Sequence, residues 1–246
     1  MSKSKRELRD QRRAAERAAT VDESRRRRIR RLLGAGGVAA VIVVVAVAVS
    51  ASGGTAKPVA GGGAAKVVAG IQEKAGVLGD PKAPITLTEY LDPQCPICAE
   101  ASKQTMPTVI AKYVRTGKVK LQARTLSFIG PDSARAAKVA AGAAQQGKEW
   151  AFLETFYASQ GTENSGYVTD SFLTDVANAS GVNAKQALAY ADTAAAQEPL
   201  DQADAEAAAL QIDSTPSFTV KKGNGAETVV AVGLGNLQAN LDKALS

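Results

Sequence analysis

The sequence predicts an α/β fold that is preceded by one transmembrane helix. Two segments of alternating hydrophobicity, 85–91 (ITLTEYL) and 118–126 (KVKLQARTL), are rich in β-forming residues and predict strands. Ala-rich segments punctuated by glycines, from Ser133 to about Leu210, predict helices and contain no convincing strand. A run of 25 residues without charge, Leu32 to Ala56, predicts the transmembrane helix.

The charge of the chain is concentrated at its N-terminus. Residues 1–31 carry 13 Lys and Arg against 5 Asp and Glu, a balance of +8, whereas the remaining residues carry 17 against 19, a balance of −2. The basic pI therefore belongs to a tail, and the rest of the chain gives no electrostatic reason to bind nucleic acid.

The apolar run is long enough to span a membrane, since as a helix it would extend about 37 Å against a hydrocarbon core of about 30 Å. The positive-inside rule makes residues 1–31 a basic cytoplasmic tail, 32–51 the transmembrane helix, and the remainder extracytoplasmic. The alternative is a cleavable signal peptide with AVSAS as its cleavage site; the long basic region and the long apolar run count against it. Both interpretations place the domain on the oxidising side of the cell membrane.

A flexible linker, 52–66, rich in Gly, Ala and Ser, is expected before a folded domain at 67–246. With 45% hydrophobic but only 4% aromatic residues, the core should rest on Ala, Val, Leu and Ile. Thr169 and Asn183 lie where helix N-caps would be. The further elements expected are a helix from Pro96 to about Thr116 ended by Gly117, three or four short helices in 133–210 with a longer one near 198–210, an antiparallel hairpin of 216–222 and 228–232, and a closing helix at about 236–245.

The only two cysteines are Cys95 and Cys98, and the chain has no histidine. The absence of histidine excludes Ser-His-Asp and Cys-His catalysis as usually built, as well as His-ligated metal sites. Two thiolates cannot close a zinc site within one chain, although a site shared between two chains stays open. A structural disulfide would close so short a loop that it would stabilise the fold by only about 2 kcal/mol. Redox chemistry is the favoured interpretation.

The local pattern supports a reactive Cys95. A strand ends near Leu91, and Pro96 suits the first position of a helix because it has no N–H to leave unpaired. Cys95 is therefore expected at the N-cap, where free N–H groups and the helix dipole favour a thiolate. Cys98 lies one turn into the helix, less exposed and on the same side, which suits a resolving thiol.

The stretch EYLDPQCPICAE, followed more than 100 residues later by STPSF at the start of a strand, resembles the thioredoxin fold. The long helical segment between them, at about 132–205, resembles the helical insertion of DsbA-like thiol–disulfide oxidoreductases. More narrowly, the chain is similar to the membrane-anchored members of that group. The likeness covers residues 67–246.

The resemblance implies roles for individual residues. Cys95 and Cys98 would be the redox pair, and Pro216 would be the cis-proline that packs beside them. Thr215 would offer its backbone to an extended substrate, with Pro96 and Ile97 also at the substrate-binding surface. Glu89 would be the buried acid that exchanges a proton with Cys98, unless it is an ordinary outward-facing strand residue. No cofactor and no metal are implied.

The chain departs from the best-known DsbA at Ile97, where that protein has histidine. The missing imidazolium implies a less oxidising disulfide, and Thr215 is a feature shared with disulfide isomerases. The function expected is a membrane-tethered oxidoreductase that introduces disulfides into secreted or envelope proteins, reoxidised by a DsbB-like or vitamin K epoxide reductase-like membrane partner. A reductase, an isomerase and a non-catalytic thioredoxin-like peptide-binding module remain alternatives.

Overall fold

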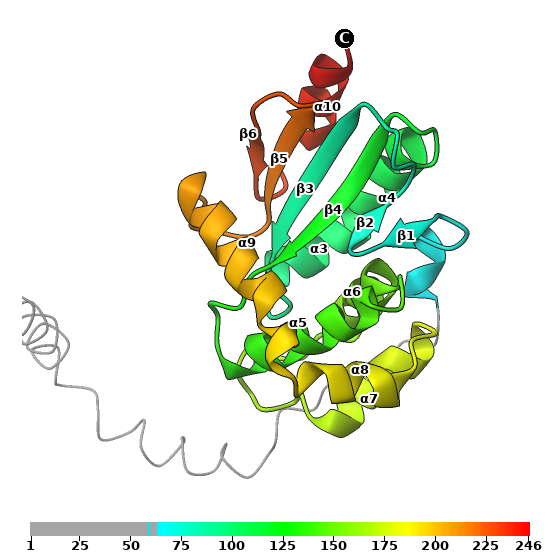
Figure 1. Ribbon diagram of the computed structural model, residues 1–246, viewed down its shortest axis with the longest axis vertical. Coiled ribbons are helices and arrows are strands. Elements are labelled where there is room, and N and C mark those ends of the chain that lie inside the picture. The colour runs from blue at the N-terminus through cyan, green and yellow to red at the C-terminus, as the bar shows by residue number, and fades with distance from the viewer. Residues whose placement is uncertain (1–58, 60–62) are drawn as a thin grey trace, which may run out of the picture. The chain divides into compact units, whose positions relative to one another are not determined.

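The computed structural model describes Val59 and residues 63–246 (Figure 1). The predicted basic tail, the predicted transmembrane helix at 32–51 and most of the predicted linker lie outside the described residues. Within the described part, no helix combines the length and the apolar character needed to cross a membrane. The last residues assigned to the linker are not extended, because Ala64–Val67 forms a 3-10 turn.

Six strands of the described chain form one mixed sheet in the order β1-β2-β4-β3-β5-β6. β3 is parallel to β4, and every other neighbouring pair is antiparallel. Because β3 is central, it is buried over nearly its whole length, including the polar Thr88 and Glu89, although its alternating sequence is typical of a half-buried strand. The strands are β1 (Glu73–Lys74), β2 (Val77–Leu78), β3 (Ile85–Leu91), β4 (Val119–Thr125), β5 (Ser217–Lys222) and β6 (Thr228–Val232).

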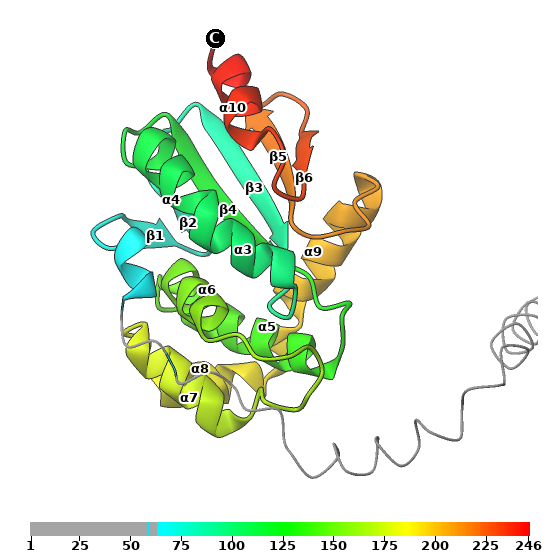
Figure 2. The ribbon, with the colours of Figure 1, turned by 180° about the vertical axis from the view of Figure 1, so that it is seen from behind.

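The helices pack on both faces of this sheet (Figures 1 and 2). Leu87 and Leu91 of β3 share a core with Cys98 and Val109, whereas Tyr90 packs on the opposite face with Leu126, Ala203 and Ala207. The helices are α3 (Pro96–Gln104), α4 (Met106–Val109), α5 (Pro131–Ala144), α6 (Glu149–Ala158), α7 (Asp170–Ala179), α8 (Ala184–Ala191), α9 (Glu198–Ala209) and α10 (Leu237–Leu245), with a π-helical turn at Ile110–Val114 and a 3-10 turn at Ala194–Ala196.

The expected helix from Pro96 to Thr116 is interrupted. α3 ends at Gln104, and α4 starts after a break at Thr105. Pro107 explains the break, because it has no N–H to bond the preceding turn and its ring crowds the carbonyl four residues earlier. The predicted stop at Gly117 is confirmed, since its φ of +72° is favourable for glycine and its N–H bonds the carbonyl of Val114.

Between β4 and β5 the chain forms a helical insert, residues 131–209, which contains no strand. Thr169 and Asn183 are confirmed as N-caps, because their side chains accept from the N–H groups of Phe172 and Gln186. The longest helix of the insert is α5 with 14 residues, not α9 with 12 as the sequence suggested. The expectation of an aliphatic core is incomplete: five aromatic rings of the insert pack as one cluster, formed by Phe152, Phe156, Tyr157, Tyr167 and Phe172.

The hairpin of β5 and β6 and the closing helix α10 agree with the sequence-based prediction to within one residue. The β1–β2 hairpin was missed, because two-residue strands carry too little alternation to be recognised. This hairpin is tied to the insert: the side chain of Glu73 accepts from the N–H of Glu149 at 2.5 Å, and the Trp150 indole donates to the carbonyl of Gly76 at 2.9 Å. These bonds hold the insert against the β1–β2 hairpin, in addition to its two covalent connections to β4 and β5.

Candidate active site

Cys95 lies at the junction where β3 gives way to α3. The helix begins at Pro96, and Cys95 is its N-cap, with extended backbone angles and a sulfur that accepts from the N–H of Cys98 at 3.4 Å. The predicted position at the helix N-terminus is thus confirmed. The backbone N–H groups of Ile97 and Cys98 and the positive end of the helix dipole favour a negative charge on this sulfur.

The pKa of Cys95 is lowered from 9.0 to about 6. The largest cause is a hydrogen bond from the side chain of Cys98, followed among the favourable ones by one from the side chain of Thr215 and by the N–H groups of Cys98 and Ile97, while burial acts in the opposite direction. In its neutral form the Cys95 thiol donates to the carbonyl of Thr215 at 3.3 Å. At neutral pH, Cys95 is therefore mainly a thiolate, the nucleophilic form of cysteine.

Cys98 is fully buried behind Cys95, and both cysteines are free thiols. Burial, the hydrogen bond to Cys95 and the charges of Cys95 and Glu89 raise the pKa of Cys98 well above its usual range. The two thiols thus differ strongly in pKa, with that of Cys95 lowered and that of Cys98 raised. Cys95 is poised to attack or be attacked, and Cys98 keeps its proton until a mixed disulfide forms beside it.

The loop before β5 closes one side of the site. The Thr215–Pro216 peptide bond is cis, as the resemblance to the thioredoxin fold implied. The bond between the Cys95 thiol and the Thr215 carbonyl joins this loop directly to the start of α3. Sequence positions 120 apart therefore meet at the sulfur.

Glu89 is buried in β3, with 2% of its surface exposed, so it is not an outward-facing strand residue. Its carboxyl lies close enough to Cys98 and Cys95 for their charges to interact. Burial, and then the charges of Glu154 and Cys95, raise the pKa of Glu89 well above its usual range. This shift favours the protonated form of Glu89, which is the form that a proton donor to Cys98 needs.

The turn before Cys95 is held by side chains that were not among the predicted site residues. Asp92 accepts from the N–H of Gln94 at 2.8 Å and from the Ser133 hydroxyl at 2.5 Å. From the helical insert, the amide of Gln160 donates to the carbonyls of Pro93 at 2.8 Å and Cys95 at 3.1 Å. The Asp-Pro dipeptide was a recognisable turn signal, whereas no local pattern pointed to Gln160.

Exposed apolar side chains flank the site. Ile97 is 42% exposed, two residues after Cys95, and Val232 is 58% exposed opposite Ser217 in the β5–β6 pair. Phe128 is 56% exposed and adjoins Ile129, whose N–H donates to Asp92. Large exposed apolar groups in one neighbourhood are typical of interaction surfaces. Phe128 was missed because a single aromatic residue in a loop carries no pattern.

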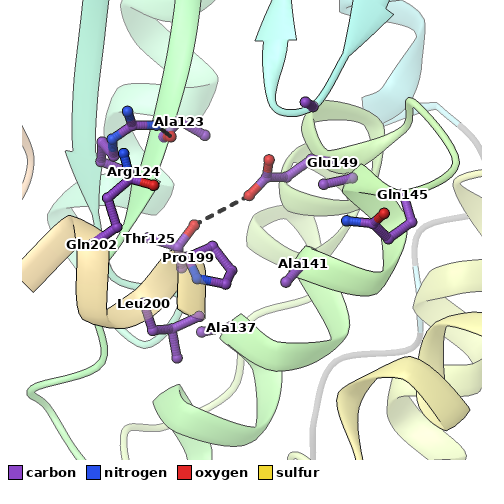
Figure 3. Close-up of a pocket in the computed structure, with 12 residues that line it drawn as sticks. Ala123, Arg124, Thr125, Ala137, Ala141, Gln145, Glu149, Pro199, Leu200 and Gln202 are labelled. Carbon is purple, nitrogen blue, oxygen red and sulfur yellow. Dashed lines mark hydrogen bonds between the residues drawn. The ribbon is translucent and has the colours of Figure 1, made fainter. Parts of the chain in front are cut away.

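A separate pocket of about 220 Å³ lies between the sheet and the helical insert, away from the cysteines (Figure 3). Arg124 and Thr125 of β4 line one side, and Gln145 and Glu149 line the other. The Glu149 carboxyl accepts from the Thr125 hydroxyl at 3.4 Å. This pocket contains neither cysteine nor any of the site residues predicted from the sequence.

The arrangement therefore brings together Cys95, Cys98, Glu89, Thr215 and Pro216, with Ile97 at the surface beside them. Pro96 starts the helix that carries both thiols. Chemically, an activated thiolate in front of a buried thiol can exchange disulfides in either direction.

Comparison with known proteins agrees with this geometry. A family model described as Thioredoxin matches residues 72–232. Two curated relatives, each named "Probable disulfide bond formation protein D", come from Bacillus cereus and Bacillus anthracis. Each is 29% identical over 101 residues, which is 40% of this chain and 47% or 46% of the relative. The chain thus spans about half the length of the curated relatives it matches.

Solved structures share the fold over a larger part of the chain. Oxidised BdbD from Bacillus subtilis has a TM-score of 0.62 at 21% identity, covering 71% of this chain and 96% of that one. A thioredoxin-like oxidoreductase from Silicibacter pomeroyi has a TM-score of 0.55 at 28% identity, covering 68% and 90%. DsbA from Chlamydia trachomatis has a TM-score of 0.59 at 19% identity, covering 69% and 90%.

These likenesses confirm the predicted DsbA-like thioredoxin fold with its helical insert. The family match covers more than half of the chain and includes both cysteines and Pro216. On this evidence the chain belongs to the thioredoxin family.

Proposed function

We propose that this protein is a membrane-tethered, extracytoplasmic thiol–disulfide oxidoreductase that introduces disulfide bonds into secreted or envelope proteins. One observation carries the proposal: the Cys95 sulfur lies at a helix N-terminus, bonded to the Thr215 carbonyl, with the thiol of Cys98 buried behind it. The names of the Bacillus relatives and of the structural neighbours, which refer to disulfide bond formation and DsbA, support the same chemistry.

The reaction would proceed in two exchange steps. A substrate thiolate attacks Cys95 of the oxidised Cys95–Cys98 pair; the disulfide breaks, a mixed disulfide forms, and Cys98 leaves and takes up a proton. A second substrate thiolate then attacks the substrate sulfur of the mixed disulfide and releases Cys95 as a thiolate. The substrate has lost two electrons to form its disulfide, and the protein's cysteine pair has gained them.

The lowered pKa of Cys95 favours the oxidising direction. A thiolate stabilised in the reduced protein makes reduction of the protein's disulfide more favourable, so the disulfide is more readily donated. A thiol with a lowered pKa is also a better leaving group when the mixed disulfide is resolved. Both effects help transfer a disulfide to a substrate rather than remove one from it.

Substrate recognition would use the backbone near Thr215 and the apolar side chains around Cys95. An extended peptide could pair with the loop before β5 and place its cysteine at the Cys95 sulfur. Ile97, Phe128 and Val232 would contact apolar side chains that an unfolded substrate exposes. Recognition of this kind depends little on substrate sequence, as is appropriate for an enzyme that acts on many secreted proteins.

The tether and the partner are part of the proposal. The basic segment 1–31 followed by the apolar segment 32–51 supports a single-pass protein with its N-terminus in the cytoplasm. A membrane protein similar to DsbB or to vitamin K epoxide reductase would reoxidise the pair: the Cys95 thiolate attacks its disulfide, Cys98 resolves the adduct, and the electrons pass to the partner.

The test is capture of mixed disulfides with the full chain expressed in cells. In Cys98→Ala, an adduct at Cys95 has no internal thiol to release it, so covalent adducts should accumulate and disappear with reductant. Cys95→Ala is the matched control and should capture none, because Cys98 is fully buried. Secreted proteins with paired cysteines among the adducts would support the proposal, and protease added outside the cell should remove the domain.

Other adducts would point to the alternatives. Cytochromes or metallochaperones, the usual targets of dedicated reductases, would replace the oxidase with a reductase. If neither variant captured a protein and both supported normal envelope disulfides, a peptide-binding module would be the better description, and the proposed oxidoreductase would be wrong.

A further inference from the structure

A second buried carboxyl lies beside the redox site on the helical insert. Glu154 of α6 is 4% exposed, and its carboxyl accepts from the hydroxyl of Ser102 at 2.5 Å. Ser102 is four residues after Cys98 on α3, so the two side chains lie on the same buried face of that helix. Glu154 is therefore bonded to the helix that carries both thiols, one turn beyond Cys98.

Glu154 also interacts electrostatically with Glu89. The charge of Glu154 is the second cause, after burial, of the raised pKa of Glu89. Both carboxyls are buried, at 4% and 2% exposure, and both lie beside α3, since Glu154 bonds Ser102 and Glu89 interacts with Cys98. Two buried carboxyls that interact in this way cannot readily both be ionised, and one tends to keep a proton.

The hydrogen bonds decide which carboxyl keeps the proton. Glu154 is bonded by the Ser102 hydroxyl, which stabilises its ionised form. The Oε2 atom of Glu89 has no hydrogen-bond partner among the described residues, so a charge there would be buried without compensation. The pKa values agree, since that of Glu154 is raised to about 7 and that of Glu89 is raised well above its usual range. As the pH rises, Glu154 therefore ionises before Glu89, and Glu89 is the carboxyl that holds its proton longer.

The other ionisable groups near this pair are few in the described structure. Cys95 and Cys98 face it from α3, and Asp92 lies in the turn between β3 and α3. The Tyr157 phenol of α6, which donates to the Asp92 carbonyl at 3.3 Å, interacts with Glu89 and both cysteines. Burial raises the pKa of Tyr157 well above its usual range, so it stays neutral. The groups here that can be charged are all acidic and favour a protonated Glu89.

We propose that Glu154, bound by Ser102, is a positioning residue for proton delivery to Cys98: its carboxylate keeps the neighbouring Glu89 protonated while Cys98 is the leaving group. The inference rests on the proposed disulfide exchange and adds a residue of the helical insert to it. When a thiolate attacks Cys95, the Cys95–Cys98 bond breaks and its electron pair goes to Cys98. Glu89 gives its proton to Cys98, becomes a carboxylate, and is reprotonated from water afterwards.

The helical insert would thus do more than cover the site. Its helix α6 brings Glu154 to the buried face of α3, at Ser102, four residues after Cys98. The insert would set the proton supply for Cys98 without touching the substrate.

The test combines a direct titration of the Glu89 carboxyl with a measurement of how fast the oxidised protein is reduced. Carbon-13 NMR of the Glu89 carboxyl in the reduced protein reports its protonation whether or not the protein acts on other proteins. The rate at which dithiothreitol reduces the oxidised protein, measured by acid quench and thiol labelling from about pH 5 to pH 9, reports the step in which Cys98 leaves. Dithiothreitol ionises equally for every variant, so ratios of rates isolate the contribution of the protein.

Glu154→Gln should lower the apparent pKa of Glu89 and slow reduction at about pH 8 by about tenfold, because less Glu89 is protonated. Glu89→Gln should slow it by about 100-fold, and adding Glu154→Gln to it should have little further effect. Ser102→Ala, a milder change, should also lower the apparent pKa of Glu89, because a less ionised Glu154 repels its charge less. Glu149→Gln is the matched control: it removes another buried carboxyl of α6, bonded to Thr125, and should leave both measurements unchanged.

An unchanged Glu89 titration in both Glu154→Gln and Ser102→Ala would overturn the inference. It would also be overturned if Glu149→Gln slowed reduction as much as Glu154→Gln, since the effect would then be general to the insert. The capture of adducts by Cys98→Ala does not depend on Glu154, so the proposed function can stand or fail separately.

Discussion

The thiol of Cys95 donates to the main-chain carbonyl of Thr215 at 3.3 Å, which joins the first turn of α3 to the loop before β5. A carbonyl is an acceptor for the thiol but offers nothing to the thiolate, so this bond is broken when Cys95 ionises. Ionisation therefore frees the Thr215 carbonyl at the moment when the sulfur becomes reactive. The same carbonyl would then be available to the backbone of a bound peptide.

The first prediction concerns the thiolate itself. In the reduced protein, thiolate absorbance against pH should show a transition near 6 for Cys95. Because the hydrogen bond from Cys98 is the largest cause of the lowering, Cys98→Ala should raise this pKa. The helix N-terminus is retained in Cys98→Ala, so the value should stay below the usual thiol value of about 8.5. A value at or above that figure would contradict the helix-terminus argument.

The lowered pKa of Cys95 also predicts how the stability of the reduced protein depends on pH. Since the pKa of Cys95 in the folded protein is about 6 against 9.0 for the reference thiol, ionisation favours the folded, reduced protein at high pH. The advantage is complete above about 9 and is lost as the pH falls through about 6. Denaturant unfolding of the reduced and oxidised forms should show the reduced form gaining stability over this range.

Much of this site was predictable because its signals are local. The N-cap position of Cys95 follows from a strand, a tight turn and Pro96 in the next position, all within a few residues. The helix break at Thr105 could also have been predicted, because Pro107 stands inside the expected helix. Tertiary contacts were harder to predict from the sequence, because residues such as Gln160 lie 65 positions from the group that they contact.

A second prediction tests that long-range contact. Gln160→Ala removes the amide that donates to the carbonyls of Pro93 and Cys95. The protein should lose about 1–2 kcal/mol of unfolding free energy, measured in denaturant, because two partly buried carbonyls lose their partner. Gln145→Ala serves as the control, since its amide makes one exposed bond of 3.4 Å to Tyr190 and should change stability by less than about 0.5 kcal/mol. Equal losses in the two variants would mean that the active-site turn does not depend on Gln160.

A third prediction concerns the acidic junction between the β1–β2 hairpin and the insert. Burial, followed by the charge of Glu73, raises the pKa of Glu149 from 4.5 to about 8. An acid with a raised folded pKa favours folding most below about 4.5, and this contribution is lost as the pH rises through about 8. Glu149→Gln stays neutral, so it should be more stable than the parent by on the order of 2 kcal/mol at about pH 8, with little difference at about pH 4.

The measurement is unfolding free energy against pH for the parent and Glu149→Gln, with the exposed Glu163→Gln as control. Some slope should remain in Glu149→Gln, because burial also raises the pKa values of Glu73 and Glu154 to about 7. A Glu149→Gln protein that parallels the parent at every pH would show that Glu149 is already ionised without cost. This pair could not be predicted from local sequence patterns, because Glu73 and Glu149 are 76 positions apart.

The last prediction concerns Ile97, which stands where the best-known DsbA has histidine. Ile97 is 42% exposed in the first turn of α3, two residues from Cys95. Ile97→His would place an imidazolium near the thiolate, so the pKa of Cys95 should fall below its present value of about 6. Each pKa unit by which Cys95 is lowered stabilises the reduced protein and should raise the reduction potential by about 30 mV, measured in glutathione redox buffers.

Ile97→Asn is the control, because it is polar but cannot carry the charge. The gain in potential should fade as the pH rises and the imidazolium loses its proton, whereas Ile97→Asn should show no such loss. Equal potentials for the two variants would mean that the apolar Ile97, and not the missing charge, sets the redox behaviour of this pair.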